Sequence, residues 1–401
     1  MGVLLGIAYA FSRNRQAISW RTVAGAFAIQ FGLGAFVLKV SWGQQLLASM
    51  TEGVNQLLSY GDAGIGFLFG GLVAEGIGFT FALKVLPIII FFASLIAVLY
   101  HIGIMKWIIR IIGGALQKVL GTSRAESMSA TANIFVGQTE APLVVKPFIA
   151  TMTQSELFAV MVGGLASVAG SALAGYALIG VPVEYLIAAC FMSAPGGLLF
   201  AKILMPETET PLKELPEVDD EDAPVNVIDA AANGASSGLS LALNVGAMLL
   251  AFVALIAVVN GVLGGVGGWF GMPELTLELL LGWLFSPLAF LLGVPWAEAV
   301  TAGSFIGQKL VVNEFVAYLN FAPYLAEGAE VVLSPKTKAI VSFALCGFAN
   351  LSSIAILLGG LGGMAPSRRK DIARMGLLAV MAGTLSNLMS GTIAGLFVAM
   401  G

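Results

Sequence analysis

Charged side chains are scarce in this sequence. Lys, Arg, Asp and Glu make up 10% of its 401 residues, whereas they approach about a quarter of the residues in soluble proteins. Hydrophobic residues account for 58%. The shortage of charge excludes an ordinary soluble protein and predicts that lipid surrounds most of the chain.

Reactive side chains are equally few. The chain has two cysteines, Cys190 and Cys346, and a single histidine, His101. Both cysteines lie in apolar segments, where free thiols pack as small hydrophobic groups, so neither a disulfide framework nor a zinc site is predicted. Because one histidine at the end of an apolar segment cannot supply the usual general base of hydrolases, we expect neither an enzyme nor a bound cofactor.

Long apolar stretches are what the sequence has instead. Stretches of about twenty residues, enough to cross a ~30 Å hydrocarbon layer as helices, recur at 22–41, 85–104, 155–180, 183–203, 238–266, 335–359 and 372–400. Residues 1–12 are interpreted as a short first membrane helix rather than a signal peptide, because no positive charge precedes them. Ten-residue segments of alternating polarity, which mark membrane strands, are lacking. The sequence therefore predicts an all-α integral membrane protein with about eight transmembrane helices.

Basic residues gather in three loops, which makes those loops cytoplasmic by the positive-inside rule. These residues are Arg13, Arg15 and Arg21, then Lys106, Arg110, Lys118 and Arg124, then Arg368, Arg369, Lys370 and Arg374. Eight crossings satisfy all three loops, so we expect a multi-pass protein of a bacterial inner membrane with both termini periplasmic. The acidic segment 206–224 would be a cytoplasmic loop, and the amphipathic residues 44–58 would lie along the membrane interface.

Short sequence matches recur in the same order in the two halves of the chain. Residues 120–126 resemble 292–298, residues 135–138 resemble 305–308, and residues 164–167 resemble 347–350. Their common order indicates two structural repeats, and the topology predicts that the repeats are inverted. We divide the chain into scaffold and interfacial helices (1–104), a first repeat (105–203), an acidic loop with a scaffold helix (204–276) and a second repeat (277–401).

Within each repeat, a polar cluster interrupts an apolar stretch before the stretch can cross the membrane. In the first repeat the cluster 137–142 (GQTEAP) lies between short apolar runs, which is the pattern of a re-entrant helical hairpin. An ionised Glu140 at membrane depth costs at least ~2.5 kcal/mol unless it faces a cavity or a partner. We favour a functional role over an ion pair with Lys146, and Glu314 is the corresponding acid of a second hairpin.

A helix with small and polar residues in its middle follows each hairpin. These residues are 163–171 (GGLASVAGS) and 347–353 (GFANLSS). Close packing through small residues is one explanation. Because both repeats have the pattern beside the hairpin, we favour an unwound break at mid-membrane that exposes carbonyl groups to an ion and hydroxyl groups to a substrate.

Three segments resemble the signature segments of the concentrative nucleoside transporters. They are 135–142 (FVGQTEAP), 313–318 (NEFVAY) and 346–354 (CGFANLSSI), and the resemblance extends over nearly the whole chain. It implies a sodium-coupled nucleoside symporter that works by alternating access, in which a domain formed by the two repeats moves like an elevator against a scaffold. It also implies a homotrimer in membrane lipid, and nucleic acid is not an expected partner.

The resemblance further implies roles for individual residues. The nucleobase would be faced by Gly137, Gln138, Thr139 and Glu140, with Ala172 and the scaffold residue Leu241 nearby. The ribose would be held by Glu314, Asn350 and Ser353, with Phe348 packed beside it. Sodium would be bound by the side chains of Asn133 and Ser167 and by the carbonyl groups of Val136 and Val168.

The sequence departs from the family pattern in two places. Residues 71–82 look shorter than the corresponding stretch, which leaves the length of an interfacial helix there open. Ser171 and Ala172 stand where a glycine and a larger apolar residue are familiar, so the preference for purines or pyrimidines is open.

Three alternatives compete with this prediction. Proton coupling would replace sodium coupling, although neither Asn133 nor Ser167 titrates, which favours sodium. A hairpin-type carrier of another small polar metabolite would share the architecture, but an anionic substrate should meet an Arg or Lys, and the clusters at 137–140, 313–314 and 348–353 have none. An intramembrane enzyme would need a nucleophile and base or metal ligands, which the sequence does not offer.

Overall fold

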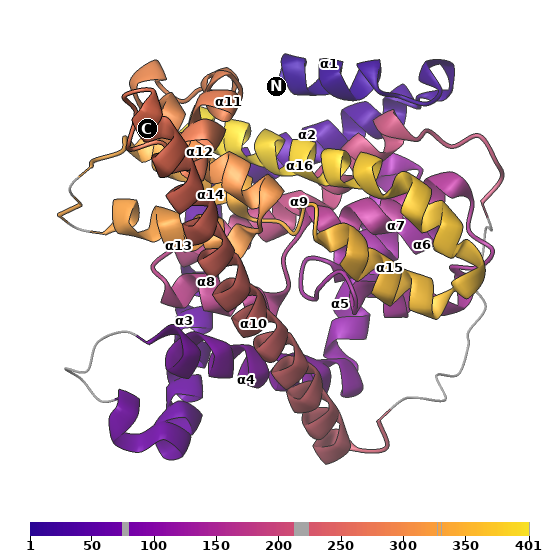
Figure 1. Cartoon of the computed structure of the whole chain (residues 1–401). Helices are drawn as coiled ribbons and strands as arrows, with labels where there is room; N and C mark the ends of the chain where they lie inside the picture. Colours follow the sequence, from indigo (N-terminus) through magenta and orange to yellow (C-terminus); the bar gives the residue numbers. More distant parts are fainter. Residues whose placement is uncertain (74–79, 212–223, 327, 330, 401) are drawn as a thin grey trace.

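The computed structural model describes residues 1–73, 80–211, 224–326, 328–329 and 331–400. Throughout these residues the regular secondary structure is helical, so the all-α prediction is confirmed (Figure 1). The N-terminal region contains α1 (Gly2–Ala10), α2 (Trp20–Lys39), α3 (Ser41–Phe69) and α4 (Phe81–His101), with 3-10 turns η1 (Arg15–Ala17) and η2 (Gly70–Val73). The predicted acidic loop and the shortened stretch at 71–82 lie partly outside the described residues, at 212–223 and 74–79.

All the long apolar stretches of the sequence fall on helices. Among the described residues, six helical segments are long and apolar enough to cross a membrane: Trp20–Lys39, Phe81–His101, Gln154–Leu178, Val183–Leu204, Val227–Trp269 and Pro366–Ala399. The stretch 335–359 forms α14 (Pro335–Leu345) and α15 (Ser353–Met364), with a non-helical break between them. Several membrane helices are thus confirmed, while the sidedness of the loops and termini stays a prediction.

Helix α1 is shorter than a membrane helix requires. Its nine residues extend about 14 Å, roughly half of the ~30 Å hydrocarbon layer. Leu4 and Ala8 on this helix are buried, and α1 packs against α9 (Val183–Leu204) and α16 (Arg369–Ala399). The first apolar segment is therefore a short helix that packs on the helix bundle and ends before Phe11, and its crossing of the membrane stays a prediction.

The two predicted repeats contain similar elements in the same order. The first comprises α5 (Ile104–Leu120), α6 (Arg124–Ala132), η3 (Ala141–Phe148), α7 (Gln154–Ala166), α8 (Gly170–Leu178) and α9. The second comprises α11 (Leu277–Leu292), α12 (Trp296–Val311), α13 (Glu314–Leu325), α14, α15, η4 (Pro366–Arg368) and α16. Helices α5 and α11 both end before a glycine with positive φ, Gly121 at 71° and Gly293 at 106°, a conformation that glycine adopts without steric cost. This order supports the repeats, while their inverted relation and the domain limits stay predictions.

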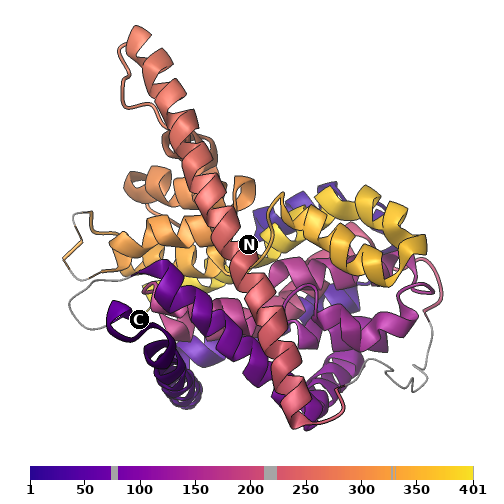
Figure 2. The same ribbon diagram turned by 60° about the horizontal axis from the view of Figure 1, so that its bottom comes forward.

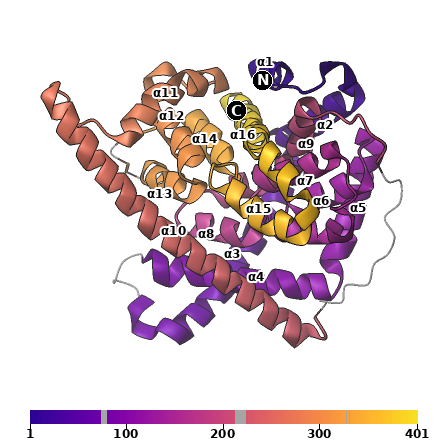
Figure 3. The same ribbon diagram turned by 45° about the vertical axis from the view of Figure 1, so that its right-hand side comes forward.

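Helix α10 (Val227–Trp269) is 43 residues long and lies diagonally across one side of the molecule, with α4 beside it (Figures 1 and 3). Figure 2 shows its C-terminal end projecting from the body of the protein. A Cβ atom at Gly238 would lie 2.8 Å from the Cα of Ile90, so a glycine is needed for the close approach of the two helix backbones. Helices α4 and α10 therefore form one tightly packed pair.

The centre of the molecule is built from α7, α9, α14 and α16, which pack against one another. It contains a buried ion pair between the Lys202 ammonium of α9 and the Glu126 carboxylate of α6. The other oxygen of Glu126, Oε2, accepts a hydrogen bond of 2.9 Å from the backbone N–H of Ser123, which caps α6. These contacts fix the first residues of the first hairpin to the core.

Candidate functional site

The first predicted hairpin consists of two short helical pieces with a turn between them. Helix α6 ends at Ala132, the chain turns through 133–140, and η3 begins at Ala141. The backbone N–H of Ala141 donates to the carbonyl of Gly137 at 2.9 Å, which closes the turn. The returning half-helix is a 3-10 helix, within whose eight residues Pro142 and Pro147 each lack a backbone donor.

The second predicted hairpin reverses between α12 and α13. Val312 and Asn313 form the connection, and the Asn313 side chain caps α13 by accepting a 2.9 Å hydrogen bond from the N–H of Val316. Such a cap satisfies a backbone donor that a helix N-terminus otherwise leaves free. Glu314 is the first residue of α13 and is 4% exposed. The acid is therefore fixed at the tip of the hairpin, as the sequence predicts.

The two predicted helix breaks are present and touch each other. Residues 167–169 separate α7 from α8, and residues 346–352 separate α14 from α15. The backbone N–H of Phe348 in the second break donates to the carbonyl of Ser167 in the first, at 3.0 Å. The first break also contacts the first hairpin, because the N–H of Gly170 donates to the carbonyl of Phe135 at 3.0 Å. Unwound backbone from both repeats thus meets at one place beside the hairpin tips.

Three residues assigned to the ribose are joined by hydrogen bonds. The Nδ2 of Asn350 donates to Oε2 of Glu314 at 3.0 Å, and the Oδ1 of Asn350 accepts from the N–H of Ser353 at 2.9 Å. The Ser353 hydroxyl donates to the carbonyl of Phe348 at 2.6 Å. A carboxylate, an amide and a hydroxyl are suitable partners for a vicinal diol. These residues therefore form one buried polar group at the second hairpin and the second break.

Tyr176 is a member of this group that the sequence analysis missed. Its hydroxyl donates to Oε1 of Glu314 at 3.2 Å, across from Asn350. The residue is fully buried on α8, and its ring lies 4.6 Å from that of Phe315 and 4.8 Å from that of Tyr318. A lone tyrosine in an apolar half-helix after the first break was the signal, since a buried hydroxyl needs a partner.

The first hairpin meets the second break through Gln138. The Nε2 of Gln138 lies 3.5 Å from Oγ of Ser353, and the Oε1 of the same side chain is buried without a hydrogen-bond partner among the described residues. An unsatisfied buried acceptor is costly, so it marks a position where a ligand donor would be stabilised. Thr139 is half-buried next to Gly360 of α15, and Glu140 is exposed. Gln138 of the base set is thus adjacent to Ser353 of the ribose set, although the two residues lie 215 positions apart in sequence.

Ala172 and Leu241 are less closely connected to this group. Ala172 is 2% exposed on α8, and Leu241 is half-buried on α10, where it packs against the apolar core. Neither side chain can form a hydrogen bond, so each could offer only apolar contact to a ring. Their assignment to the nucleobase stays a prediction.

The residues assigned to sodium lie where the first hairpin meets the first break. Asn133 is 1% exposed and donates through Nδ2 to the carbonyl of Ser129 at 2.9 Å, while its Oδ1 has no hydrogen-bond partner in the described part of the chain. Ser167 is equally buried, with its hydroxyl donating to the carbonyl of Gly163 at 3.0 Å. A Cβ atom at Gly163 would lie 3.1 Å from Nδ2 of Asn133. A free amide oxygen beside unwound backbone fits a hard cation such as sodium.

Val136 and Val168, whose carbonyl groups complete the predicted ion site, are also buried. The described residues contain no cluster of three or more His, Cys, Asp or Glu side chains that could hold a metal ion. The four residues assigned to the ion offer only neutral oxygen atoms, from one amide, one hydroxyl and two carbonyl groups. The chemistry of the four residues fits sodium, and the ligand set itself stays a prediction.

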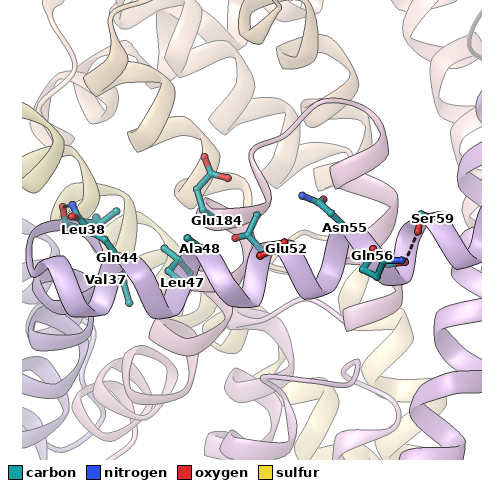
Figure 4. Close-up of a pocket in the computed structure, with 11 residues that line it drawn as sticks. Val37, Leu38, Gln44, Leu47, Ala48, Glu52, Asn55, Gln56, Ser59 and Glu184 are labelled. Atoms are coloured by element: carbon teal, nitrogen blue, oxygen red, sulfur yellow. Dashed lines mark hydrogen bonds between the residues drawn. The ribbon is translucent and has the colours of Figure 1, made fainter.

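A separate cavity of about 610 Å³ lies between α3 and the start of α9. Figure 4 shows Glu184 of α9 beside the side chains of α3 that line the cavity, Ala48 and Glu52 among them. None of the residues predicted for substrate or sodium lines this cavity. It is not the site built from the hairpins and the helix breaks.

Three family models together match most of the chain. Residues 1–72 match the N-terminus and residues 185–395 the C-terminus of the Na+ dependent nucleoside transporters, and residues 82–182 match a nucleoside recognition model. The nucleoside permease NupC of Helicobacter pylori is 57% identical over 99% of this chain and 96% of its own length. The human solute carrier family 28 member 3 is 39% identical over 97% of this chain and 58% of its own length.

Solved structures of relatives also resemble this chain over its full length. CNTnw in an inward-facing, substrate-bound state has 63% sequence identity and a TM-score of 0.97, with 100% of this chain and 97% of that chain covered. A double variant of CNTnw in an outward-facing state has the same identity and coverage and a TM-score of 0.98. The fold described here is therefore one that has been observed in both inward-facing and outward-facing states.

Proposed function

Because this chain belongs to the Na+ dependent, concentrative nucleoside transporter family, we propose that it imports nucleosides by symport with sodium. The observation that carries the proposal is the contact between Nε2 of Gln138 and Oγ of Ser353. This contact joins the polar residues of the first hairpin to those of the second break. A nucleoside has a hydrogen-bonding base at one end and a diol at the other. The two groups of residues offer partners for both ends.

The residue roles in this proposal follow the two groups. Gln138, Thr139 and Glu140, with Gly137, Ala172 and Leu241 beside them, face the base. Glu314, Asn350 and Ser353 hold the ribose, with Phe348 packed against it. The unsatisfied Oε1 of Gln138 supports this arrangement, because a base N–H would complete its hydrogen bonding.

Sodium binds in the proposal at the first break, to Asn133, Ser167 and the carbonyl groups of Val136 and Val168. The unsatisfied Oδ1 of Asn133 supports this position. When bound, the ion supplies positive charge that orients these oxygen atoms, and its electrochemical gradient supplies the driving force. At a tenfold gradient and ~100 mV, one ion provides about 3.7 kcal/mol, enough for about 500-fold accumulation of the substrate.

We propose an elevator-like movement, in which the domain formed by the two repeats moves against the scaffold of a trimer. The two repeats carry the site, and the Phe348–Ser167 backbone hydrogen bond supports their moving as one body. The α4–α10 pair would belong to the scaffold, and three copies would assemble through scaffold helices in the inner membrane, with both termini periplasmic. CNTnw has been solved in inward-facing and outward-facing states, which supports alternating access for a chain of this fold.

Uptake by purified protein in liposomes tests the function. We expect radiolabelled uridine to accumulate when sodium is high outside and to stop accumulating when choline replaces sodium at constant pH. A pH gradient without sodium should drive no accumulation. Accumulation driven by the pH gradient alone would assign the coupling to protons, and uptake of a dicarboxylate in place of uridine would overturn the substrate class.

A further inference from the structure

Asn387 lies in the middle of α16 and bonds to both broken helices. It is 2% exposed. Its Nδ2 donates to the carbonyl of Ala166 at 2.6 Å and to the carbonyl of Cys346 at 2.9 Å. Ala166 is the last residue of α7, and Cys346 directly follows α14. One amide group therefore satisfies backbone carbonyls at the break of each repeat.

The other end of the same amide is held by a buried ammonium group. Lys309, on α12 of the second hairpin, is 3% exposed and donates to Oδ1 of Asn387 at 2.7 Å and to the carbonyl of Ala344 at 2.8 Å. Cations are stabilised near the C-terminal end of a helix, and Ala344 lies in the last turn of α14. The second hairpin is thus fixed to Asn387 and to the second break through one side chain.

Gly347 makes room for this arrangement. A Cβ atom at position 347 would collide with the Asn387 amide, so a side chain there would displace it. The amide has no other orientation that keeps these contacts, because both of its hydrogens and its oxygen are engaged. The orientation of the Asn387 amide is therefore fixed by contacts to both repeats.

The pair formed by Lys309 and Asn387 is connected to both predicted binding positions through neighbouring residues. On the ion side, Ala166 directly precedes Ser167, and a shift of the Ala166 carbonyl would move the Ser167 and Val168 oxygens with it. On the substrate side, Lys309 is followed by Leu310, whose carbonyl accepts a 3.1 Å hydrogen bond from Leu351 in the second break. Neither Lys309 nor Asn387 is a member of either predicted ligand set.

We infer that Asn387, held by Lys309, is a positioning residue that couples the second hairpin to the ion site at the first break. When the hairpin closes on substrate, Lys309 keeps the Asn387 amide directed at Ala166, and the unwound backbone presents its oxygens to the ion. Any effect of the ion on substrate binding must equal the effect of substrate on ion binding. The inference rests on the proposed sodium-coupled transport of nucleosides.

The test measures this coupling directly. Uridine is titrated into purified protein by calorimetry at low and at saturating sodium, with potassium keeping the ionic strength constant. The ratio of the two dissociation constants is the coupling factor. Asn387→Asp keeps an acceptor for Lys309 but removes both donors. Because hydrogen bonds to two buried carbonyls are lost, we expect the sodium concentration at half-saturation to rise about tenfold. The coupling factor should fall toward one.

A second variant and a matched control make the result specific. Lys309→Met leaves the Asn387 donors in place but frees the amide, so the coupling factor should also fall. Thr392→Val is the control, because its hydroxyl is buried on the same helix and donates only within it, to Leu388 at 2.8 Å. This variant should keep the wild-type coupling factor. The thermal midpoint of each variant is recorded alongside, since a residue that only supports the fold would lower the midpoint and leave the factor unchanged.

The outcomes separate the inference from the function on which it rests. A wild-type protein whose uridine affinity does not respond to sodium would contradict the proposed function. A wild-type response that persists unchanged in Lys309→Met or in Asn387→Asp would overturn the inference alone. If Asn387→Asp does not fold, Lys309→Met decides by the same criterion.

Discussion

The Nδ2 of Asn350 lies 3.0 Å from Oε2 of Glu314, so the second helix break and the second hairpin are joined at their polar residues. Tyr176 donates to the other carboxylate oxygen at 3.2 Å from the first repeat. Each oxygen of Glu314 thus has a protein donor, and the two donors come from different repeats. A carboxylate held in this way is oriented before a sugar hydroxyl reaches it, which reduces the cost of ordering the site on binding.

Replacing Glu314 by Gln should weaken nucleoside binding by about ten- to a hundredfold, since a charge-assisted hydrogen bond is worth roughly 1.5–3 kcal/mol. Binding of the free base uracil should hardly change. Glu140→Gln is the matched variant, and it should affect uridine and uracil alike because its assigned contact is to the base. The measurement is calorimetric titration with uridine, its deoxy analogues and uracil. Equal losses for uridine and the deoxy analogues in Glu314→Gln would remove the ribose assignment.

Replacing Tyr176 by Phe should weaken the binding of uridine but not of uracil, as Glu314→Gln does, and by a smaller factor. The ring contacts with Phe315 and Tyr318 remain, so the protein should stay folded, and the loss of one hydrogen bond to Glu314 should weaken uridine binding by about tenfold. Uracil binding should be unchanged. Thermal unfolding in detergent controls for damage to the core, and a variant that binds uridine normally would show that Tyr176 has only a packing role.

Replacing Asn133 or Ser167 by Ala should raise the sodium concentration needed for half-maximal uptake. Each variant removes one neutral oxygen ligand of the proposed site, so the expected increase is about tenfold, a free-energy difference of about 1.4 kcal/mol. Uptake at saturating sodium should approach the wild-type rate. The measurement is the sodium dependence of uridine uptake in liposomes, and Ser155→Ala, a buried serine of α7 that donates to the carbonyl of Met205 at 2.7 Å, is the control. Unchanged sodium dependence in both site variants would show that the ion binds elsewhere.

Replacing Lys202 by Met should destabilise the protein, because it leaves the Glu126 carboxylate buried without its ammonium partner. Loss of one member of a buried ion pair costs about 3–5 kcal/mol, whereas removal of both members is often nearly neutral. Adding Glu126→Gln to Lys202→Met should therefore restore much of the stability. The midpoint of thermal unfolding in detergent reports both effects. Lys106→Met, on the exposed side of α5, should leave the midpoint unchanged.

The membrane helices and the places where they break could be predicted from the sequence. A run of twenty apolar residues has few ways to bury its backbone in lipid other than as a helix, and so α2, α4 and α9 fall on the predicted stretches. The breaks at 167–169 and 346–352 follow small and polar residues that occur in both repeats. Local composition was sufficient for these features because the reasons for them are local.

The contacts between distant residues could not be predicted in the same way. Tyr176 contacts Glu314 across 138 positions of sequence, and Asn387 contacts Ala166 across 221. Neither pairing can therefore be inferred from the residues next to it in the sequence. Asn387 did carry a signal, since an amide in the middle of an apolar segment needs a partner.

Helix α10 leaves large apolar side chains uncovered along its length, from Leu239 to Val266. At 43 residues it is about 65 Å long, roughly twice the ~30 Å thickness of a hydrocarbon layer. A helix of this length must either incline or extend beyond the layer, and its inclination responds to the thickness of the bilayer. We therefore expect the acyl-chain length of the surrounding lipid to influence the angle of the α4–α10 pair, so that the rate of transport differs between thin and thick membranes.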